Sequence, residues 1–264
     1  MSDHSLARTW AALRTDSRTA LIPYLTAGYP TWDASLAALR SAADVSDIIE
    51  VGVPFSDPLA DGPTIQRSTF EALRQGMTLP RTLALIAEAQ LERPVVVFSY
   101  LNPILRYGLD RFLQDAASIG VAGLLLTDLP AAADPAVEAA VGASPIDLIR
   151  LVAPTTRADR LRAAVQGAGG FIYLVARLGV TGASTALAAE LPGAVARVRE
   201  ATTLPIAVGF GISTADQARA VARIADGVVV GSALVDTLGS SGVEGAARFL
   251  RVLRDAVDTA EAVR

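Results

Sequence analysis

Eight short apolar runs recur along the chain, each bounded by glycine, proline or aspartate. Most of them are continuously apolar, which is typical of parallel strands covered on both faces. Stretches rich in alanine, leucine and arginine with helical spacing lie between the runs. The runs begin at Leu21, Asp47, Pro94, Val121, Ile146, Phe171, Leu204 and Asp226. Strands alternating with helices, without a break in composition, predict an α/β fold, a single (β/α)8 TIM barrel.

Helical spacing is clearest in four of the intervening stretches, 33–43, 79–91, 158–165 and 214–224. Serine, threonine and aspartate cap helices because their side chains accept hydrogen bonds from the first free amides. We therefore expect N-caps at Thr31 or Asp33, at Thr156 and at Ser213. The rival fold is a doubly wound open sheet, and the absence of a G-x-G-x-x-G pattern after the first strand counts against its dinucleotide-binding version.

We expect one domain over residues 1–264, with a short N-terminal leader or helix over about residues 1–18. Two intervals between apolar runs are longer than the others, the second and the sixth. In a TIM barrel the active site lies in the loops that follow the strands. Extended loops after strands 2 and 6 are therefore expected to hold or cover a substrate.

Composition excludes several classes of chemistry. The chain has no cysteine and no lysine, and its single histidine, His4, lies near the beginning. These counts rule out a thiolate nucleophile, a Schiff-base lysine and a Walker lysine, and they leave no basis for a metal cluster. The net charge of −4 without a basic cluster argues against nucleic acid. No apolar run is long enough to span a membrane or resembles a secretion signal, so we expect a cytoplasmic protein.

Glu50 interrupts the second apolar run, "DIIEVGV". If Ile48 and Glu50 share the inward face of the strand, Glu50 lies near the top of the barrel. Loss of water there would raise its pKa towards neutrality, as suits a group that first donates and then accepts a proton. The alternative is a carboxylate paired with an arginine at the rim, and position alone does not decide between the two.

Asp61 follows in a loop rich in proline and glycine, where it can fold back over the mouth of the barrel. An isolated loop aspartate is more often a turn residue or a helix cap. Two carboxylates at one mouth, in a chain without lysine, favour acid–base chemistry by Glu50 and Asp61. We expect Asp61 to stay ionised in its more polar loop while Glu50 stays protonated.

The seventh and eighth runs end in "GFGIS" and "VVVGSAL". TIM barrels frequently bind phosphate after these two strands, with glycine amides and a helix N-terminus. Gly211, Gly231 and Ser232 supply such groups, although a single Gly-Ser step would be an ordinary turn. The pattern predicts an organic phosphate substrate. Thr181, between two glycines after the sixth run, lies in a segment with the composition of a lid.

The stretch "IEVGVPFSDPLADGPTIQ" resembles the signature of the tryptophan synthase alpha subunit. "LIPYLTAGYP", "YLNPI", "LLLTDLP", "GVTG", "GFGIS" and "VVVGSAL" are similar to other blocks of that family, in the same order, so the resemblance covers nearly the whole chain. It implies a lyase of tryptophan biosynthesis that cleaves indole-3-glycerol phosphate to indole and D-glyceraldehyde 3-phosphate. It also implies an α2β2 heterotetramer, in which a beta subunit condenses the indole with serine. Pyridoxal phosphate belongs to that partner, and no cofactor is expected in this chain.

The resemblance assigns roles to particular residues. Glu50 matches the acid/base of the family and Asp61 its second catalytic carboxylate, while Thr181 matches a lid threonine that closes towards Asp61. The phosphate-binding positions match Gly182, Gly211, Gly231 and Ser232. The residues around the indole or the glycerol chain match Tyr24, Tyr100, Tyr173 and Phe210. The departures are Ala176, where serine is common in the family, and Tyr24, where phenylalanine also occurs.

The same resemblance suggests where a partner docks. Pro54, Phe55, Asp57 and Pro58 lie between the two carboxylates, on the face where the family binds its beta subunit. A phenylalanine beside prolines is typical of an interface anchor, and the alternative is a ring packed under its own loop.

Two other functions remain open at this point. A different phosphate-binding barrel of tryptophan biosynthesis, such as indole-glycerol-phosphate synthase, would be expected to carry a catalytic lysine, which is absent. A non-catalytic regulatory subunit would be indicated by loss of Glu50 or Asp61, and both are present. An assay for indole release from indole-3-glycerol phosphate, with and without a beta subunit, discriminates between them.

Overall fold

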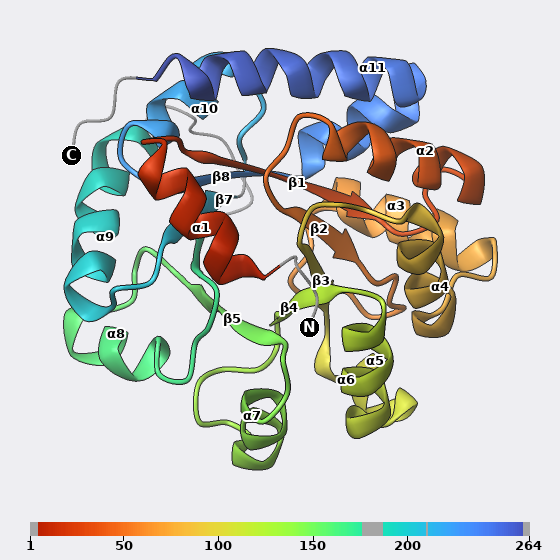
Figure 1. Ribbon diagram of the computed structural model, residues 1–264, viewed down its shortest axis with the longest axis horizontal. Helices are drawn as coiled ribbons and strands as arrows, with labels where there is room; N and C mark the ends of the chain where they lie inside the picture. The colour runs from red at the N-terminus through yellow and green to blue at the C-terminus, as the bar shows by residue number, and fades with distance from the viewer. Residues whose placement is uncertain (1–4, 176–186, 210, 261–264) are drawn as a thin grey trace.

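The chain folds into a closed barrel of eight parallel strands surrounded by helices (Figure 1). The computed structural model describes residues 5–175, 187–209 and 211–260. The strands pair in sequence order, and β1 pairs with β8 to close the barrel. They are β1 (Ala20–Thr26), β2 (Ile49–Gly52), β3 (Val95–Ser99), β4 (Val121–Leu126), β5 (Asp147–Val152), β6 (Ile172–Val175), β7 (Ile206–Gly209) and β8 (Gly227–Val230). The predicted (β/α)8 TIM barrel is confirmed; seven strands lie within the predicted runs, and β1 begins one residue before its run.

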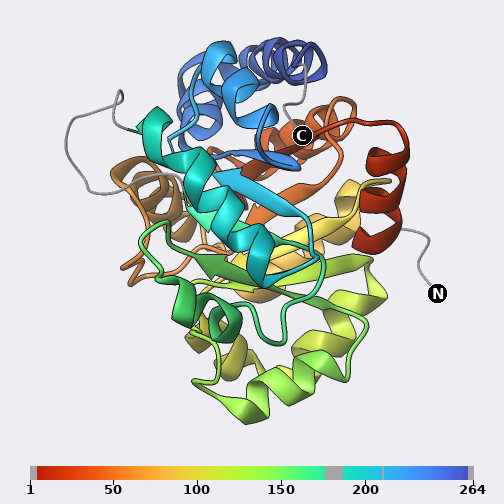
Figure 2. The same ribbon diagram turned by 90° about the vertical axis from the view of Figure 1, so that its left-hand side faces the viewer.

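Helices form the outer layer of the barrel (Figures 1 and 2). They are α1 (Leu6–Thr15), α2 (Trp32–Ala43), α3 (Pro63–Arg74), α4 (Leu79–Ala89), α5 (Leu101–Tyr107), α6 (Leu109–Ser118), α7 (Pro135–Gly142), α8 (Ala158–Ala164), α9 (Leu187–Ala201), α10 (Ala215–Ala222) and α11 (Ser232–Asp258). The long interval between β2 and β3 contains two helices, α3 and α4. The long α11 is kinked at Gly242, where the backbone φ is 67°.

Burial explains why the strands read as continuous apolar runs. Every residue of β1, β2, β3, β4, β7 and β8 is buried, because side chains fill the barrel on one face and meet helices on the other. The lower, N-terminal end of the barrel is closed by α1, drawn in red at the right of Figure 2. Leu6 of α1 lies against Gly123 and Gly170, and Trp10 lies against Gly227. This packing places the open end of the barrel, and any site in it, at the C-terminal ends of the strands.

The helix caps test the boundaries predicted from sequence. Thr31 caps α2 by accepting from the Ala34 amide at 3.2 Å, so the first of the two alternatives is confirmed. The predicted caps at Thr156 and Ser213 are wrong, each by one residue. Thr156 lies in a turn, with its amide bonded to the Ala153 carbonyl, and the extended Arg157 precedes α8.

Ser213 loses the cap of α10 to its neighbour Thr214. Thr214 accepts from the Gln217 amide at 3.2 Å, and the Gln217 side chain accepts from the Thr214 amide at 3.2 Å, which forms a reciprocal capping box. Gln217 also accepts from the Ser213 amide at 2.8 Å. The position of the glutamine, and not the type of the capping residue, therefore decides where α10 begins.

Candidate active site

A cavity of about 540 Å³ opens at the C-terminal ends of the strands. Its walls come from β1, β2, β3 and β6, from the segment between β2 and α3, and from the turn before α11. The lining residues are Tyr24, Glu50, Leu59, Ala60, Asp61, Gly62, Pro63, Thr64, Ile65, Phe98, Tyr173, Val175, Gly211, Gly231 and Ser232. Residues far apart in sequence meet here because all parallel strands end at the same rim of the barrel.

Glu50 lies in the inward layer of β2, between Tyr24 of β1 and Val96 of β3 in the strand register. Its side chain is completely buried, and neither carboxylate oxygen has a hydrogen-bond partner among the described residues. The paired-arginine alternative therefore finds no support in this part of the chain. Burial raises the pKa of Glu50 from 4.5 to about 8, so the side chain is mainly protonated at neutral pH.

Asp61 lies on the opposite wall, in the segment that runs from β2 to α3, and its carboxylate is half-buried. Burial raises its pKa from 3.8 to about 6, and a hydrogen bond from the Tyr100 hydroxyl opposes that rise. Asp61 thus remains mainly ionised at pH 7, although by a smaller margin than its loop composition suggested. The two carboxyl groups of the site differ in charge at the same pH.

Tyr100 acts on the Asp61 segment from behind the cavity. Its hydroxyl accepts from the Ala60 amide at 2.8 Å and also bonds the Asp61 side chain. Gln66 holds the same segment from α3, because its amide nitrogen donates to the Asp61 carbonyl at 2.9 Å. Tyr100 does not itself line the cavity, but its hydroxyl contacts Ala60 and Asp61, which do, so its place around the substrate stays a prediction.

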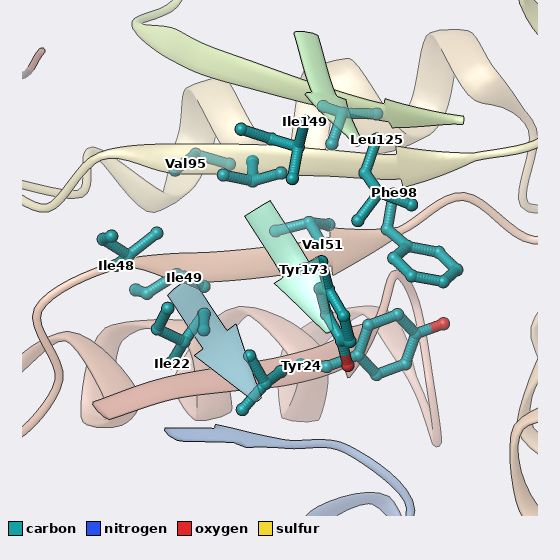
Figure 3. Packing of buried hydrophobic residues seen from close by; sticks show 14 of the residues in the cluster. Ile22, Tyr24, Ile48, Ile49, Val51, Val95, Phe98, Leu125, Ile149 and Tyr173 are labelled. Atoms are coloured by element: carbon teal, nitrogen blue, oxygen red, sulfur yellow. The ribbon is translucent and has the colours of Figure 1, made fainter. Parts of the chain in front are cut away.

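Tyr24, Tyr173 and Phe98 gather near the C-terminal ends of their strands, away from the aliphatic layer below (Figure 3). Tyr24 meets Phe98 edge to face at 5.3 Å between ring centroids. Burial, followed by neighbouring carboxylates, raises the pKa of both tyrosine hydroxyls, which therefore stay neutral. These rings form an aromatic wall beside Glu50, which suits the binding of an aromatic ring system.

Glycines at two strand ends make room for the tyrosines. A β-carbon on Gly52 would lie 2.0 Å from the Tyr24 hydroxyl, and one on Gly209 would lie 2.1 Å from the Tyr173 hydroxyl. No other residue type fits while the tyrosines keep these positions. The sequence analysis did not single out either glycine, because the close approach comes from the neighbouring strand.

Gly211, Gly231 and Ser232, which follow the seventh and eighth runs, all line this cavity. Gly231 is the N-cap of α11 and supplies no side chain, so the first amides of the helix have no capping partner. Gly211 has a φ of 89°, which favours glycine and exposes its backbone to the cavity. Uncapped amides at a helix N-terminus are suited to bind a phosphate group.

Three predicted site residues, Thr181, Gly182 and Phe210, lie outside the described residues, as does Ala176. Within the described ranges, sequence reasoning missed Phe98, Ile65 and Val175, which line the cavity. They are ordinary apolar residues, and only the closure of the barrel brings them to its mouth.

The predicted interface residues differ in exposure. Pro54 is buried, Pro58 is half-buried and Asp57 is exposed. Phe55 packs against the Tyr100 ring, with centroids 5.2 Å apart, as in the alternative that placed the ring under its own loop. The most exposed large apolar side chain here is Leu59, at 94% exposure, which sequence reasoning missed.

Two kinds of feature are absent from the described ranges. No group of three or more His, Cys, Asp or Glu side chains in those ranges is arranged to hold a metal ion. None of the helices described combines the length and the apolar character needed to cross a bilayer.

Comparison with known proteins identifies the same relationship across nearly the whole chain. A sequence model of the family "Tryptophan synthase alpha chain" matches residues 10–263. The alpha chain of Gluconobacter oxydans is 48% identical, over 88% of this chain and 87% of its own. The alpha chain of Gluconacetobacter diazotrophicus is 46% identical, over 98% of this chain and 97% of its own.

Solved structures agree with the sequence relatives. A chain of the Mycobacterium tuberculosis tryptophan synthase structure has a TM-score of 0.88 and 41% identity, covering 97% of this chain and 99% of that one. The alpha subunit from Legionella pneumophila has a TM-score of 0.89 and 32% identity, with the same coverage of 97% and 99%. The chain belongs to the tryptophan synthase alpha chain family.

Proposed function

We propose that Glu50 and Asp61 carry out the cleavage of indole-3-glycerol phosphate in this chain. As the alpha subunit of a tryptophan synthase, the chain is a carbon–carbon lyase of tryptophan biosynthesis that releases indole and D-glyceraldehyde 3-phosphate. The observation that carries the proposal is the Glu50 carboxyl, which is buried at the cavity without a partner among the described residues. A buried carboxyl that no structural contact explains is suited to exchange a proton with a ligand.

The first step of the proposed mechanism is protonation of the indole ring. Protonated Glu50 donates its proton to C3 of the indole, which breaks the aromaticity of the ring and places positive charge on N1. Ionised Asp61 accepts a hydrogen bond from N1–H and stabilises that charge. The difference in pKa between the two carboxyl groups supports this division of roles, because one is a proton donor and the other an anion at the same pH.

The second step breaks the bond between the indole and the glycerol chain. Glu50, now a carboxylate, removes the proton from the hydroxyl on the carbon attached to C3. The electrons of that O–H bond form the aldehyde carbonyl, and the electrons of the C–C bond return to the ring and restore its aromaticity. Glu50 ends the cycle protonated, so it acts as both acid and base.

The phosphate is proposed to bind at the other end of the cavity. The amides of Gly211 and Gly231 and the N-terminus of α11 at Ser232 can donate to its oxygens without a cationic side chain. Gly182, Thr181 and Phe210 are assigned to phosphate binding, lid closure and the substrate pocket by the family resemblance alone. The tyrosine wall of Tyr24 and Tyr173 holds the indole ring near Glu50.

The partner in this proposal is a beta subunit, with which the chain forms an α2β2 tetramer. That subunit holds pyridoxal phosphate and condenses the indole with serine, and the pathway operates in the cytoplasm. The docking face is proposed around Pro54, Phe55, Asp57 and Pro58. Exposed Leu59 in the same segment supports this face, because an apolar side chain at 94% exposure suits burial by a partner.

The catalytic proposal is tested by Asp61→Asn. The amide keeps the shape of the side chain but cannot neutralise the charge on N1, and we expect indole release to fall by about 100-fold or more. Binding of glycerol 3-phosphate should change by less than twofold, since that ligand lacks the indole ring. Indole release within threefold of the wild-type rate would overturn the role of Asp61.

The docking proposal is tested by Asp57→Ala, assayed with and without the beta subunit. A partner that orders the 53–62 segment should raise turnover by pre-organising Asp61, without adding a catalytic group. We expect the variant to lose most of this stimulation while its rate alone stays near that of the wild type. Equal losses in both assays would place Asp57 in the active site and remove it from the interface.

A further inference from the structure

Asp236 of α11 is a shared acceptor for two side chains of α3. The Thr64 hydroxyl donates to Asp236 Oδ2 at 2.9 Å, and the Arg67 guanidinium pairs with Asp236 Oδ1. Both oxygens of the carboxylate are thus used, each by a different residue. The contact joins two helices that lie side by side on the barrel (Figures 1 and 2).

The two helices that Asp236 joins both begin at the cavity. α11 starts at Ser232 in the proposed phosphate site, and Asp236 lies one turn further along. α3 starts at Pro63, directly after Asp61 and its neighbour Gly62, and Thr64 itself lines the cavity. The bridge therefore connects the first turns of the two helices, close to their catalytic ends.

The backbone of Asp61 follows the position of α3. Gly62 is the N-cap of the helix, and the Gln66 side chain donates to the Asp61 carbonyl at 2.9 Å. A shift of the first turn of α3 would thus move the Asp61 backbone with it. The Thr26–Ser68 hydroxyl pair, at 2.8 Å, anchors α3 further from its N-terminus and on its buried face.

We propose that Asp236 is a positioning residue, which sets the distance between the Asp61 carboxylate and the phosphate-binding turn of α11 through Thr64 and Arg67. This inference rests on the proposed function, since it takes Asp61 as the catalytic carboxylate. The substrate joins its indole ring to its phosphate through a short glycerol chain. Both ends bind productively only when the spacing between their two sites matches that chain.

The bridge contributes to geometry more than to stability. Arg67 and Asp236 are 53% and 50% exposed, and ion pairs at such exposure contribute little to the stability of a fold. Its loss should leave the barrel folded. A rate effect without a stability effect is therefore the signature expected of a positioning role.

The test compares Asp236→Ala with Asp216→Ala, which removes the exposed Arg219–Asp216 pair on α10, neither residue of which lines the cavity. Small misplacements of a reacting group cost up to about 100-fold, and we expect kcat for Asp236→Ala to fall about tenfold. The dissociation constant for glycerol 3-phosphate and the thermal midpoint should both stay near wild type. The control should retain full kcat.

The Arg67→Ala variant and the double variant complete the cycle. If Arg67 acts only through Asp236, the double variant should be no slower than Asp236→Ala alone. If the kcat losses of the two single variants multiply in the double variant, the proposal is overturned. A kcat for Asp236→Ala within twofold of wild type would also overturn it, as would a weakening of glycerol 3-phosphate binding as large as the loss in kcat. Asp61→Asn distinguishes failure of the proposed function from failure of this inference. An active Asp61→Asn enzyme would overturn the catalytic role of Asp61. An inactive Asp61→Asn enzyme together with a fully active Asp236→Ala enzyme would overturn only the positioning role of Asp236.

Discussion

Asp47 and Glu50 are two buried carboxylates three residues apart, one just before β2 and one inside it, and their surroundings are opposite. At the lower end, Asp47 accepts from the Leu21 amide at 2.9 Å and from Arg254 at 2.8 Å, with Arg18 at 3.5 Å. At the mouth, Glu50 has no hydrogen bond from any described residue. The two side chains are close in sequence and both buried, and they differ in their partners.

The comparison separates a structural charge from a functional one. Arg254 also donates to the Thr19 carbonyl at 3.0 Å and pairs with Asp258, so the lower site ties the final helix to the start of β1. Such a network satisfies a buried charge fully. The burial of Glu50 instead raises its pKa to about 8 and is left uncompensated, as expected where a proton must be exchanged.

The sharpest way to break this comparison is to neutralise each carboxylate in turn, beginning with Glu50→Gln. The amide cannot donate or accept the proton that the reaction needs, and acid–base groups contribute about 100- to 10,000-fold. We expect indole release to fall by at least that range, while the unfolding free energy measured below pH 4.5, where Glu50 is protonated in both states, changes little. If the Glu50→Gln enzyme kept half of the wild-type turnover, the unpartnered carboxyl of Glu50 would have no catalytic role.

Asp47→Asn should have the reverse effect. Breaking a buried ion pair costs up to about 3–5 kcal/mol, and here Arg254 keeps Asp258 as a more exposed counter-charge, so we expect a loss of roughly 1–3 kcal/mol. Urea unfolding should show this loss, and the folded fraction should still release indole at close to the wild-type rate. An unchanged unfolding midpoint would show that Arg254 and Arg18 find other partners.

A pH series sharpens the contrast through Glu50. Its pKa is raised in the folded protein to about 8 from 4.5, so the folded state holds a proton that the unfolded state releases. Stability from this group is therefore full below pH 4.5 and is lost as the pH rises towards 8. Unfolding free energy of the wild type should fall by a few kcal/mol relative to Glu50→Gln over that window. Parallel curves for the two proteins would contradict the shift.

The smallest expected effect belongs to Arg18→Ala. Arg18 reaches Asp47 at 3.5 Å, but its side chain is 41% exposed, in contrast to 10% for Arg254. Solvent screens such a contact, and its loss should cost less than about 1 kcal/mol in urea unfolding. A cost equal to that of Asp47→Asn would mean that the exposed arginine, and not the buried one, neutralises the carboxylate.

Sequence alone predicted the parts of the molecule that local patterns determine. The eight apolar runs marked the strands, and the interruption of one run by a glutamate marked Glu50, because a buried charge is rare in a strand. Asp61 and the pair Gly231–Ser232 followed from their places after strands in a TIM barrel. Each of these predictions depended on residues near in sequence.

The rest depends on contacts between distant segments. The Asp47–Arg254 pair spans 207 positions, and nothing in either neighbourhood of the sequence indicates the other. The Tyr24 ring above Gly52 and the exposed Leu59 follow from where neighbouring strands and loops come to lie. Even the start of α10 was decided by a side chain further along, Gln217, which completed a capping box with Thr214.

The pairing of Asp47 with the final helix also bears on how the chain is made. A ribosome adds about 5–20 residues per second, so Asp47 emerges roughly 10–40 s before Arg254, which lies 207 positions later. Throughout that interval Asp47 lacks Arg254, the buried cation of its pair, and has only the partly exposed Arg18. A polypeptide released early, without α11, would leave Asp47 without its buried partner. The pair that closes this end of the barrel can therefore form only after α11 has been synthesised, near the end of translation.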